Sequence, residues 1–340
     1  MDFNLKHQAY ISELNQTLSK IDDIDLAKKR LTYLRWKVAE NLDKLLFEFE
    51  TNIRKTDGTL VWAPAIEQAI EQLSKHLAPY NNVRFIQHQA VKRLVSGGSV
   101  KVPEIPTHAD AVVIGAKFLL ANTGNFFSAF HSLEEYESLL QAKKIIVIGG
   151  IDSFLASQND LPIAKQLYSI FETGKISYEA EILSRPGKAR GMTAEIVLIL
   201  IDDKRSQLLE NPVHRPLFSL LNFELPPVCP LEQIRTTDRD DWQSVNSLDY
   251  FLYPFTHQFQ NFTRHFLNNY GLKLLNNYIP YDMDLSDHVM EARVSAIGPE
   301  KKNPLMSIID SDRSSVVLNS KKFKDKQQFE KYAALHFFGK

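Results

Sequence analysis

The residues ADAVVIGAKFLLANTG, at positions 109–124, decide the fold that this sequence predicts. Two short apolar runs stand in this stretch, and each ends at a turn that contains glycine: the first at Gly115, the second at Asn122-Thr123-Gly124. Apolar runs of this length between turn residues are typical of buried β-strands. Ligands of open α/β sheets bind just beyond strand ends, so we expect Gly115, Asn122, Thr123 and Gly124 to contribute to a ligand site. Two sharp turns between buried strands would require glycine equally well.

Helical and strand-like patterns alternate on both sides of this stretch, an order that is typical of a parallel α/β sheet. Apolar residues recur at three- and four-residue spacing up to Asp57-Gly58, which predicts an N-terminal helical segment, and Pro64 opens a further helix. A tight turn at residues 123–125 predicts that the next strand is antiparallel to the one before it. The predicted strands are 59–62, 83–86, 111–114, 118–121, 126–130, 144–148, 177–183 and 195–201, and helices are expected at 133–141 and from 160 to 172.

The character of the chain changes after Pro212, where prolines become frequent and a charged run, 235–241, follows. Such a segment is typical of a boundary between domains. We therefore expect a helical segment at 1–58 that packs on the core, an α/β domain at 59–231, and a C-terminal α+β extension at 232–340. Within the extension the pattern predicts a strand at 315–318 and a helix at 325–338.

The composition is that of a globular chain with a sizeable core, since 44% of the 340 residues are hydrophobic and 24% are charged. Lysine plus arginine (40) nearly balance aspartate plus glutamate (41), so no basic field favours nucleic acid. The N-terminus lacks the apolar core of a secretory signal, and the apolar runs are far shorter than the ~20 residues of a membrane span. We expect a cytoplasmic chain without nucleic-acid partners and without membrane insertion.

A second candidate for anion binding is the loop RPGKARG at 185–191, between two predicted strands. Lys188 and Arg190 could clamp a carboxylate or a phosphate, but an exposed hairpin tip would have the same composition. Asp202, with Asp203 and Arg205 after it, follows the strand predicted at 195–201 and could line the same edge of the sheet as this loop. It could also cap the next helix without any role in binding. The ten histidines show no metal-ligand spacing, so the sequence predicts no metal site.

Five motifs, in order along the chain, resemble the lactate utilisation (LUD) domain family. They are ENLDKLLFEFETNIRKTDGTLVWAPA (40–65), VVIGAKFLLANTG (112–124), KKIIVIGGIDSF (143–154), DLPIAKQLYSIFETGKIS (160–177) and EIVLILIDDKRSQLLENPVHRPLF (195–218). The resemblance covers roughly residues 31–231 and is closest to the iron–sulfur, B-type members. It implies a three-layer α/β sheet with helices on both faces, similar to the ribose-5-phosphate isomerase and CoA-transferase folds. It also implies a place in a bacterial cytoplasmic assembly that oxidises lactate to pyruvate.

Two departures from the family pattern bear on function. The family signature resembles TGANFAIAETG, and its glutamate is Asn122 here, so the motif has lost its carboxylate. The family continues into a C-x-x-C-x-x-x-C-P motif, whereas this chain has NFELPPVCP at 222–230, with Cys229 as its single cysteine. A cubane cluster needs several thiolates, so we expect no iron–sulfur cluster and no other cofactor.

Two functions remain open at this point. The first is a cluster-free subunit of lactate or hydroxy-acid metabolism, which binds a small anionic ligand or assembles with partner subunits. The second is an active enzyme on a small anionic metabolite, such as a hydroxy acid, a sugar phosphate or a CoA ester. In that case the loop of Lys188 and Arg190 and the Thr123-Gly124 turn would hold the substrate. The sequence identifies no catalytic residue for either function.

Overall fold

The structure is a computed structural model of the chain. It describes residues 3–86, 88, 90–92, 94, 109–188, 194–212, 214–226, 228–229, 276–284, 316–318 and 321–323. The chain forms two compact units: unit 1 comprises residues 1–32, 167–176 and 207–340, and unit 2 comprises residues 33–166 and 177–206. The boundaries expected near residues 58 and 231 stay predictions. The helix predicted at 325–338 lies outside the described residues.

The helices are α1 (Phe3–Leu18), α2 (Ile24–Glu40), α3 (Leu42–Arg54), α4 (Ile66–Leu77), α6 (Leu133–Gln141), α7 (Leu161–Thr173) and α8 (Gln207–Glu210), with short 3-10 helices η1 (Ile151–Ser153), η2 (Gln158–Asp160), η3 (Arg215–Leu220) and η6 (Asn276–Tyr278). The strands are β1 (Thr59–Ala63), β2 (Val83–Phe85), β3 (Ala111–Gly115), β4 (Phe118–Leu120), β5 (Asn125–Phe130), β6 (Lys144–Gly150), β7 (Phe154–Leu155), β8 (Ala180–Ser184), β9 (Gly187–Lys188), β10 (Glu195–Ile201), β11 (Val316–Leu318) and β12 (Lys321–Phe323).

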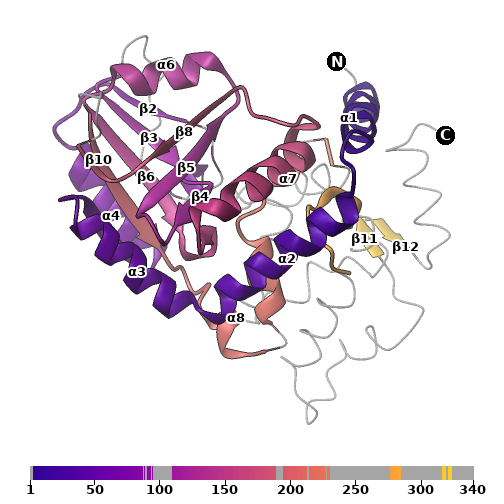
Figure 1. The fold of residues 1–340 in the computed structure, drawn as a ribbon. Helices are drawn as coiled ribbons and strands as arrows, with labels where there is room; N and C mark the ends of the chain where they lie inside the picture. The colour runs from indigo at the N-terminus through magenta and orange to yellow at the C-terminus, as the bar shows by residue number, and fades with distance from the viewer. Residues whose placement is uncertain are drawn as a thin grey trace. The chain divides into compact units, whose positions relative to one another are not determined.

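Unit 2 is built on a parallel sheet with the strand order β1-β10-β6-β3-β2. Figure 1 labels β10, β6, β3 and β2 of this sheet. The three inner strands are runs of valine, isoleucine and leucine, and nearly all of their residues are buried. Continuous apolar runs of this kind suit strands that are covered on both faces. The short β9 pairs antiparallel with the beginning of β10, at Glu195 and Ile196.

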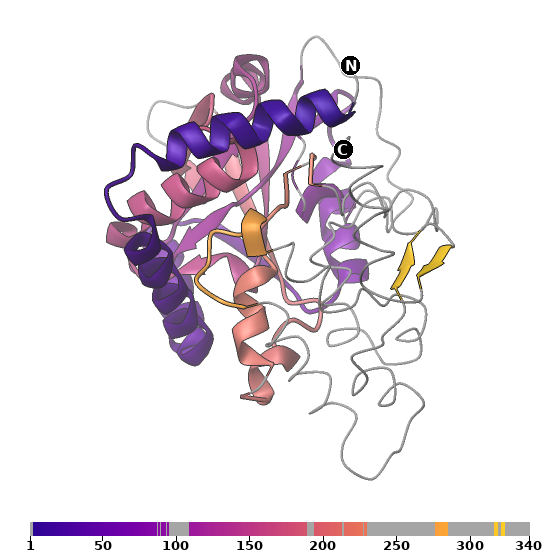
Figure 2. The same cartoon turned by 90° about the vertical axis from the view of Figure 1, so that its right-hand side faces the viewer.

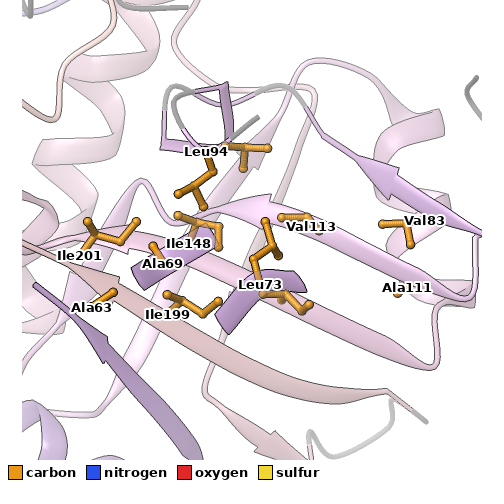
Figure 3. Packing of buried hydrophobic residues seen from close by; sticks show 12 residues of the cluster. Ala63, Ala69, Leu73, Val83, Leu94, Ala111, Val113, Ile148, Ile199 and Ile201 are labelled. Carbon is orange, nitrogen blue, oxygen red and sulfur yellow. The ribbon is translucent and has the colours of Figure 1, made fainter. Parts of the chain in front are cut away.

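Helix α4 covers one face of this sheet. Its Ala69 and Leu73 pack on alternate residues of the strands, among them Val113, Ile148 and Ile199 (Figure 3). Alternation follows from the two-residue period of a strand. Fully burying aliphatic side chains of this size stabilises the fold by about 1.5–3 kcal/mol each. This layer therefore fixes which face of each strand points toward α4.

A second, four-stranded sheet, with the order β7-β4-β5-β8, lies against the other face. Contacts between the sheets include the Ser128 hydroxyl, which donates to the Gly115 carbonyl at 2.8 Å, and the side chain of Leu119, which lies beside Gly149. Strands β4 and β5 are antiparallel across their tight turn, as predicted. On the outer face of this sheet, Lys165 of α7 pairs with Glu181 of β8 at 2.5 Å.

In unit 1, tyrosine hydroxyls join segments that are distant in sequence. The Tyr278 hydroxyl and the His7 Nε2 are 2.9 Å apart, and the Tyr10 hydroxyl donates to the Phe171 carbonyl at 2.7 Å. The Tyr281 hydroxyl donates to the Ser219 carbonyl at 2.8 Å. Strands β11 and β12, the yellow arrows in Figure 2, form a short antiparallel pair.

The predicted three-layer α/β class and the N-terminal helical segment are confirmed. The predicted strands lie close to those observed, except that the strand expected at 177–183 begins only at Ala180. Gly174, with φ of +81°, ends α7, and several bends follow it before β8 starts. Strand β9 was not expected, because it consists of only two residues and lies within the segment predicted as a loop.

Candidate functional site

The parallel strands all end on the same side of the sheet, which we call its carboxyl edge. Strand β3 ends there at Gly115 and β6 at Gly150. Gly115 is the register partner of Ile148. Gly150 therefore lies two residues farther along the neighbouring strand and on the same face, which is the face that α4 covers. From the usual strand spacing and rise, the two glycine Cα atoms are about 8 Å apart. Each glycine leaves room for a polar side chain from elsewhere.

An ion pair fills the space over Gly150. A Cβ at this position would collide with the Arg205 guanidinium and the Asp152 carboxylate. Arg205 Nη1 donates to Asp152 Oδ1, and the two residues are only 7% and 1% exposed. Charges removed from water to this degree are costly unless they are paired. Gly150 is therefore required by this pair.

A second arginine contacts the backbone of the segment that follows β6 and contains Asp152. Arg35 of α2 is fully buried, and its Nη1 and Nη2 donate to the carbonyl oxygens of Phe154 and Asp152. Among the described residues, its Nε has no hydrogen-bond partner. Arg35 and Arg205 thus place two buried guanidinium groups on Asp152, Arg205 on its carboxylate and Arg35 on its backbone carbonyl.

A tight turn after β10 brings Arg205 over the end of β6. The Arg205 amide donates to the Asp202 carbonyl at 3.1 Å, and the two central residues, Asp203 and Lys204, have φ of +48° and +63°. This is the pattern of a type I′ turn. The left-handed region costs a non-glycine residue roughly 1–2 kcal/mol, and the amides of Asp202 and Asp203 hold the turn by donating to the Ala63 and Pro64 carbonyls. Strain of this kind is often found at functional sites.

The imidazole of His88 fills the space over Gly115. A Cβ at position 115 would overlap the ring. The Ala90 amide donates to His88 Nδ1 at 3.2 Å, and the His88 carbonyl accepts from the Lys92 amide at 2.8 Å. The ring is therefore held at the carboxyl edge by its own chain segment.

Lys117 lies in the link between β3 and β4 and is almost fully buried. Its amide donates to the Phe127 carbonyl at 2.8 Å, and its Nζ is 5.2 Å from the centroid of the Tyr178 ring. An ammonium over an aromatic face is attracted by the ring quadrupole. Lys117 adds a further cationic side chain near the end of β3.

The predicted site residues divide between the two ends of the sheet. Gly115 and Asp202 lie at the carboxyl edge, whereas the backbone of Lys188 in β9 lies opposite Glu195 at the beginning of β10. The seven residues of β10 separate Lys188 from Asp202, a distance of roughly 20 Å. Both oxygens of the Asp202 carboxylate accept from Ser206, from its amide at 2.8 Å and its hydroxyl at 2.7 Å. Arg190 lies outside the described residues.

The turn of Asn122, Thr123 and Gly124 packs against the end of α3. Gly124 has φ of +71°, and a Cβ there would lie 3.1 Å from the Ile53 amide nitrogen. The Asn122 side chain accepts from the Gln158 amide at 3.0 Å and donates to the Ser157 hydroxyl at 3.3 Å. Ile53 also contacts Gly58, directly before β1 begins. The turn therefore lies near the start of β1 and not at the carboxyl edge.

Sequence reasoning considered Arg205 beside Asp202 but did not single out Arg35 or His88. The available signal was a pair of strands that each end in glycine. That signal becomes specific only when the register places Gly115 and Gly150 on one face. Arg35 carries no local signal, because its partners follow it by more than 100 residues.

The residues that align with the family's cluster motif do not fit an iron–sulfur cluster. Asn222 and Leu225 stand at two of the cysteine positions, and Cys229 is buried beside Tyr10 and Tyr278, whose pKa values are raised chiefly by burial. The described part of the chain has no group of three or more histidine, cysteine, aspartate or glutamate side chains able to hold a metal ion. Among the described helices, none has the length and apolar character needed to cross a membrane.

Comparisons with known proteins give one match. No family model matches the chain, and no curated protein matches it. Among solved structures, the chain is similar to a DUF162 family protein from Deinococcus radiodurans, with 16% sequence identity and a TM-score of 0.36. The match covers 47% of this chain and 98% of the other.

Proposed function

We propose that unit 2 binds a small anionic metabolite at the carboxyl edge of its parallel sheet, with Arg205 as the main ligand-binding residue. The observation that carries this proposal is the arrangement of Arg35 and Arg205 around Asp152. Arg205 pairs with the Asp152 carboxylate, whereas Arg35 donates to the backbone carbonyl oxygens of Asp152 and Phe154. Both arginines are buried, and an excess of buried positive charge is unfavourable in a medium of low dielectric. An anion bound beside Arg205 would neutralise that excess.

The guanidinium of Arg205 has donors to offer such an anion. Within the part of the chain that the structure describes, its recorded hydrogen bond is the one from Nη1 to Asp152. Arginine presents its donors in a planar fork that matches carboxylate and phosphate oxygens. Asp152 would hold the guanidinium in place while the remaining N–H groups bind the ligand.

The sequence resemblance supports the class of ligand and the setting. Because the motifs resemble the LUD family, we propose a hydroxy acid or a related carboxylate as the metabolite. The chain would act in the cytoplasm as a cluster-free binding subunit of an assembly for lactate or hydroxy-acid metabolism. Cys229, as the single cysteine, supports a role that does not include electron transfer through an iron–sulfur cluster.

The proposal is tested by calorimetric titration of the full chain with lactate, pyruvate, ribose 5-phosphate and acetyl-CoA. Arg205→Lys keeps a cation beside Asp152 but removes the fork, and hydrogen bonds to charged groups contribute about 1.5–3 kcal/mol. We therefore expect it to weaken binding about tenfold or more. Arg84→Lys is the matched control, because Arg84 is a partly buried arginine of β2 that pairs with Glu134 at 3.0 Å. Absence of binding by all four compounds, or equal affinity in Arg205→Lys and wild type, would contradict the proposal.

A further inference from the structure

We propose that strand β8 pairs with β8 of a second copy of this chain, antiparallel and about a two-fold axis at Leu183. This interface belongs to the four-stranded sheet of unit 2 and does not depend on the proposed function. In the strand order β7-β4-β5-β8, β8 is an end strand, so β5 is its neighbour among the described strands. The other side of an end strand, here the outer edge of β8, offers backbone donors and acceptors to a strand of another chain.

The register of the sheet shows which backbone groups face the outer edge. Along a strand of an antiparallel sheet, the N–H and C=O groups of successive residues point alternately to the two sides. The Phe127 carbonyl points to the β4 side of β5, because it accepts from the Lys117 amide at 2.8 Å. Leu183 is the register partner of Phe127, so these two residues exchange no hydrogen bonds with each other. The N–H and C=O of Leu183 therefore face outward, and so do those of Glu181.

The outward row of β8 is open. In the part of the chain that the structure describes, the N–H and C=O groups of Glu181, Leu183 and Arg185 on this side have no hydrogen-bond partner. Arg185 comes directly after β8 and continues the row, because a residue before proline is held extended. Alternation directs the nitrogen of Pro186 to the β5 side, so this proline does not interrupt the row. Leu183, at the centre of the row, is 43% exposed.

The side chains along this row are complementary to those of a second copy. Glu181, Leu183 and Arg185 are spaced two residues apart, which places all three on one face of the sheet. A two-fold axis at Leu183 sets Glu181 opposite the second copy's Arg185, on both sides of a pair of leucines. Opposite charges and apolar side chains in directly opposing positions stabilise antiparallel strands.

Both charged side chains have atoms that can make this pair. Arg185 donates from Nε to Asn125 Oδ1 at 3.2 Å, and among the described residues its two Nη groups have no partner. Glu181 accepts from Lys165 on Oε2, which leaves Oε1 for an arginine. Because the two opposite charges are equally far from Leu183, the edge fits a second copy of itself better than a peptide of one charge sign. A contact of this size suits a weak, reversible dimer.

Sedimentation velocity of the full chain over about 1–100 μM tests the dimer. We expect the mass to rise from that of one chain to twice that value as the concentration increases. Arg185→Glu sets carboxylates opposite each other on both sides of the axis, and Glu181→Arg does the same with guanidinium groups. Each variant should weaken dimerisation about tenfold or more. An equimolar mixture of the two variants should dimerise again, because every charge then lies opposite one of the other sign.

Lys44→Glu is the control for charge reversal, because Lys44 is an exposed residue of α3; it should dimerise as wild type does. Leu183→Pro removes the central N–H, which the pairing of β8 with β5 does not use, so we expect a monomer with an unchanged circular dichroism spectrum. A wild-type protein that stays monomeric at every concentration would overturn the proposal. So would equal dimerisation of wild type, Arg185→Glu and Leu183→Pro, or a mixture of the two charge variants that stays monomeric.

Residue-resolved hydrogen exchange of the wild-type chain reports the state of the edge without any variant. In dilute protein the amides of Leu183 and Arg185 should exchange fast, whereas those of Ile182 and Ser184, which face β5, should be protected. At concentrations where the dimer forms, Leu183 and Arg185 should become protected as well. Fast exchange at both concentrations would show that no strand pairs with this edge. Protection already in the dilute sample would show that another part of the same chain covers it, and either result overturns the inference.

Discussion

Single residues at the carboxyl edge are organised around the space that two glycines leave empty. Gly150 accommodates the pair of Asp152 and Arg205, and Gly115 accommodates His88. A side chain at either glycine would push a polar group out of position, so the glycines act on the site without contacting a ligand through a side chain. Sequence analysis identified Gly115 correctly as the end of a buried strand, but it could not show which side chain lies over it.

The buried pair at Asp152 makes this residue important for stability. Asp152→Asn keeps the shape of the side chain but leaves Arg205 without its carboxylate, and breaking a buried pair costs about 3–5 kcal/mol. We expect a loss of this size in the free energy of unfolding, measured with chemical denaturant. Asp110→Asn is the control, because Asp110 pairs with a largely exposed lysine, Lys143, at 2.8 Å. Exposed pairs contribute about 0–1 kcal/mol, and equal losses in both variants would contradict the account.

The buried His7 of unit 1 makes stability depend on pH. Burial lowers the pKa of His7 below its ordinary value of 6.5, so the unfolded chain takes up the proton first. The contribution of neutral His7 is complete above about pH 6.5 and is lost as the pH falls below it, by at most about 1.4 kcal/mol per pH unit.

His7→Gln tests this dependence, since glutamine does not titrate but can still bond the Tyr278 hydroxyl. The difference in unfolding free energy between about pH 7.5 and about pH 5.5 should be smaller in His7→Gln than in wild type. A difference of the same size in both proteins would show that His7 is not the titrating group.

Among the elements, the position of each strand along the chain was far easier to predict than the strands beside which it lies in the sheet. The run at 195–201 and the run at 144–150 are apolar enough to be identified alone, and the structure has β10 and β6 there. Lys188 precedes β10 and Asp202 follows it, so a strand of seven residues separates the two. Of the predicted residues, Gly115 and Asp202 therefore lie at the carboxyl edge, whereas Lys188 and the turn at 122–124 lie toward the starts of β10 and β1.

The turn between β10 and α8 offers a test of stored strain. Lys204 has φ of +63°, and glycine adopts this conformation without penalty. We expect Lys204→Gly to raise the free energy of unfolding by about 1 kcal/mol. Lys44→Gly is the control, because Lys44 is an exposed residue inside α3, where glycine should destabilise by about 1 kcal/mol. A loss of stability in both variants would show that the turn is not strained.

For the whole molecule, the class of the fold follows from the sequence while the location of the site does not. Alternating apolar runs and amphipathic helices were sufficient for a layered α/β fold. Locating the site required the strand order, which sets β3, β6 and β10 side by side. The residues of unit 2 that we assign to the site come from α2, from both sides of β3, and from the loops after β6 and β10, so no single motif contains them.

Hydrogen–deuterium exchange of the full chain with saturating lactate tests the location of the site most directly. We expect slower exchange in peptides covering 115–117, 151–153 and 203–206, where the backbone follows the carboxyl ends of β3, β6 and β10. Peptides covering 122–124 and 186–191 should exchange at the same rate with and without lactate. Protection of 122–124 and 186–191, with no change at the carboxyl edge, would contradict the account.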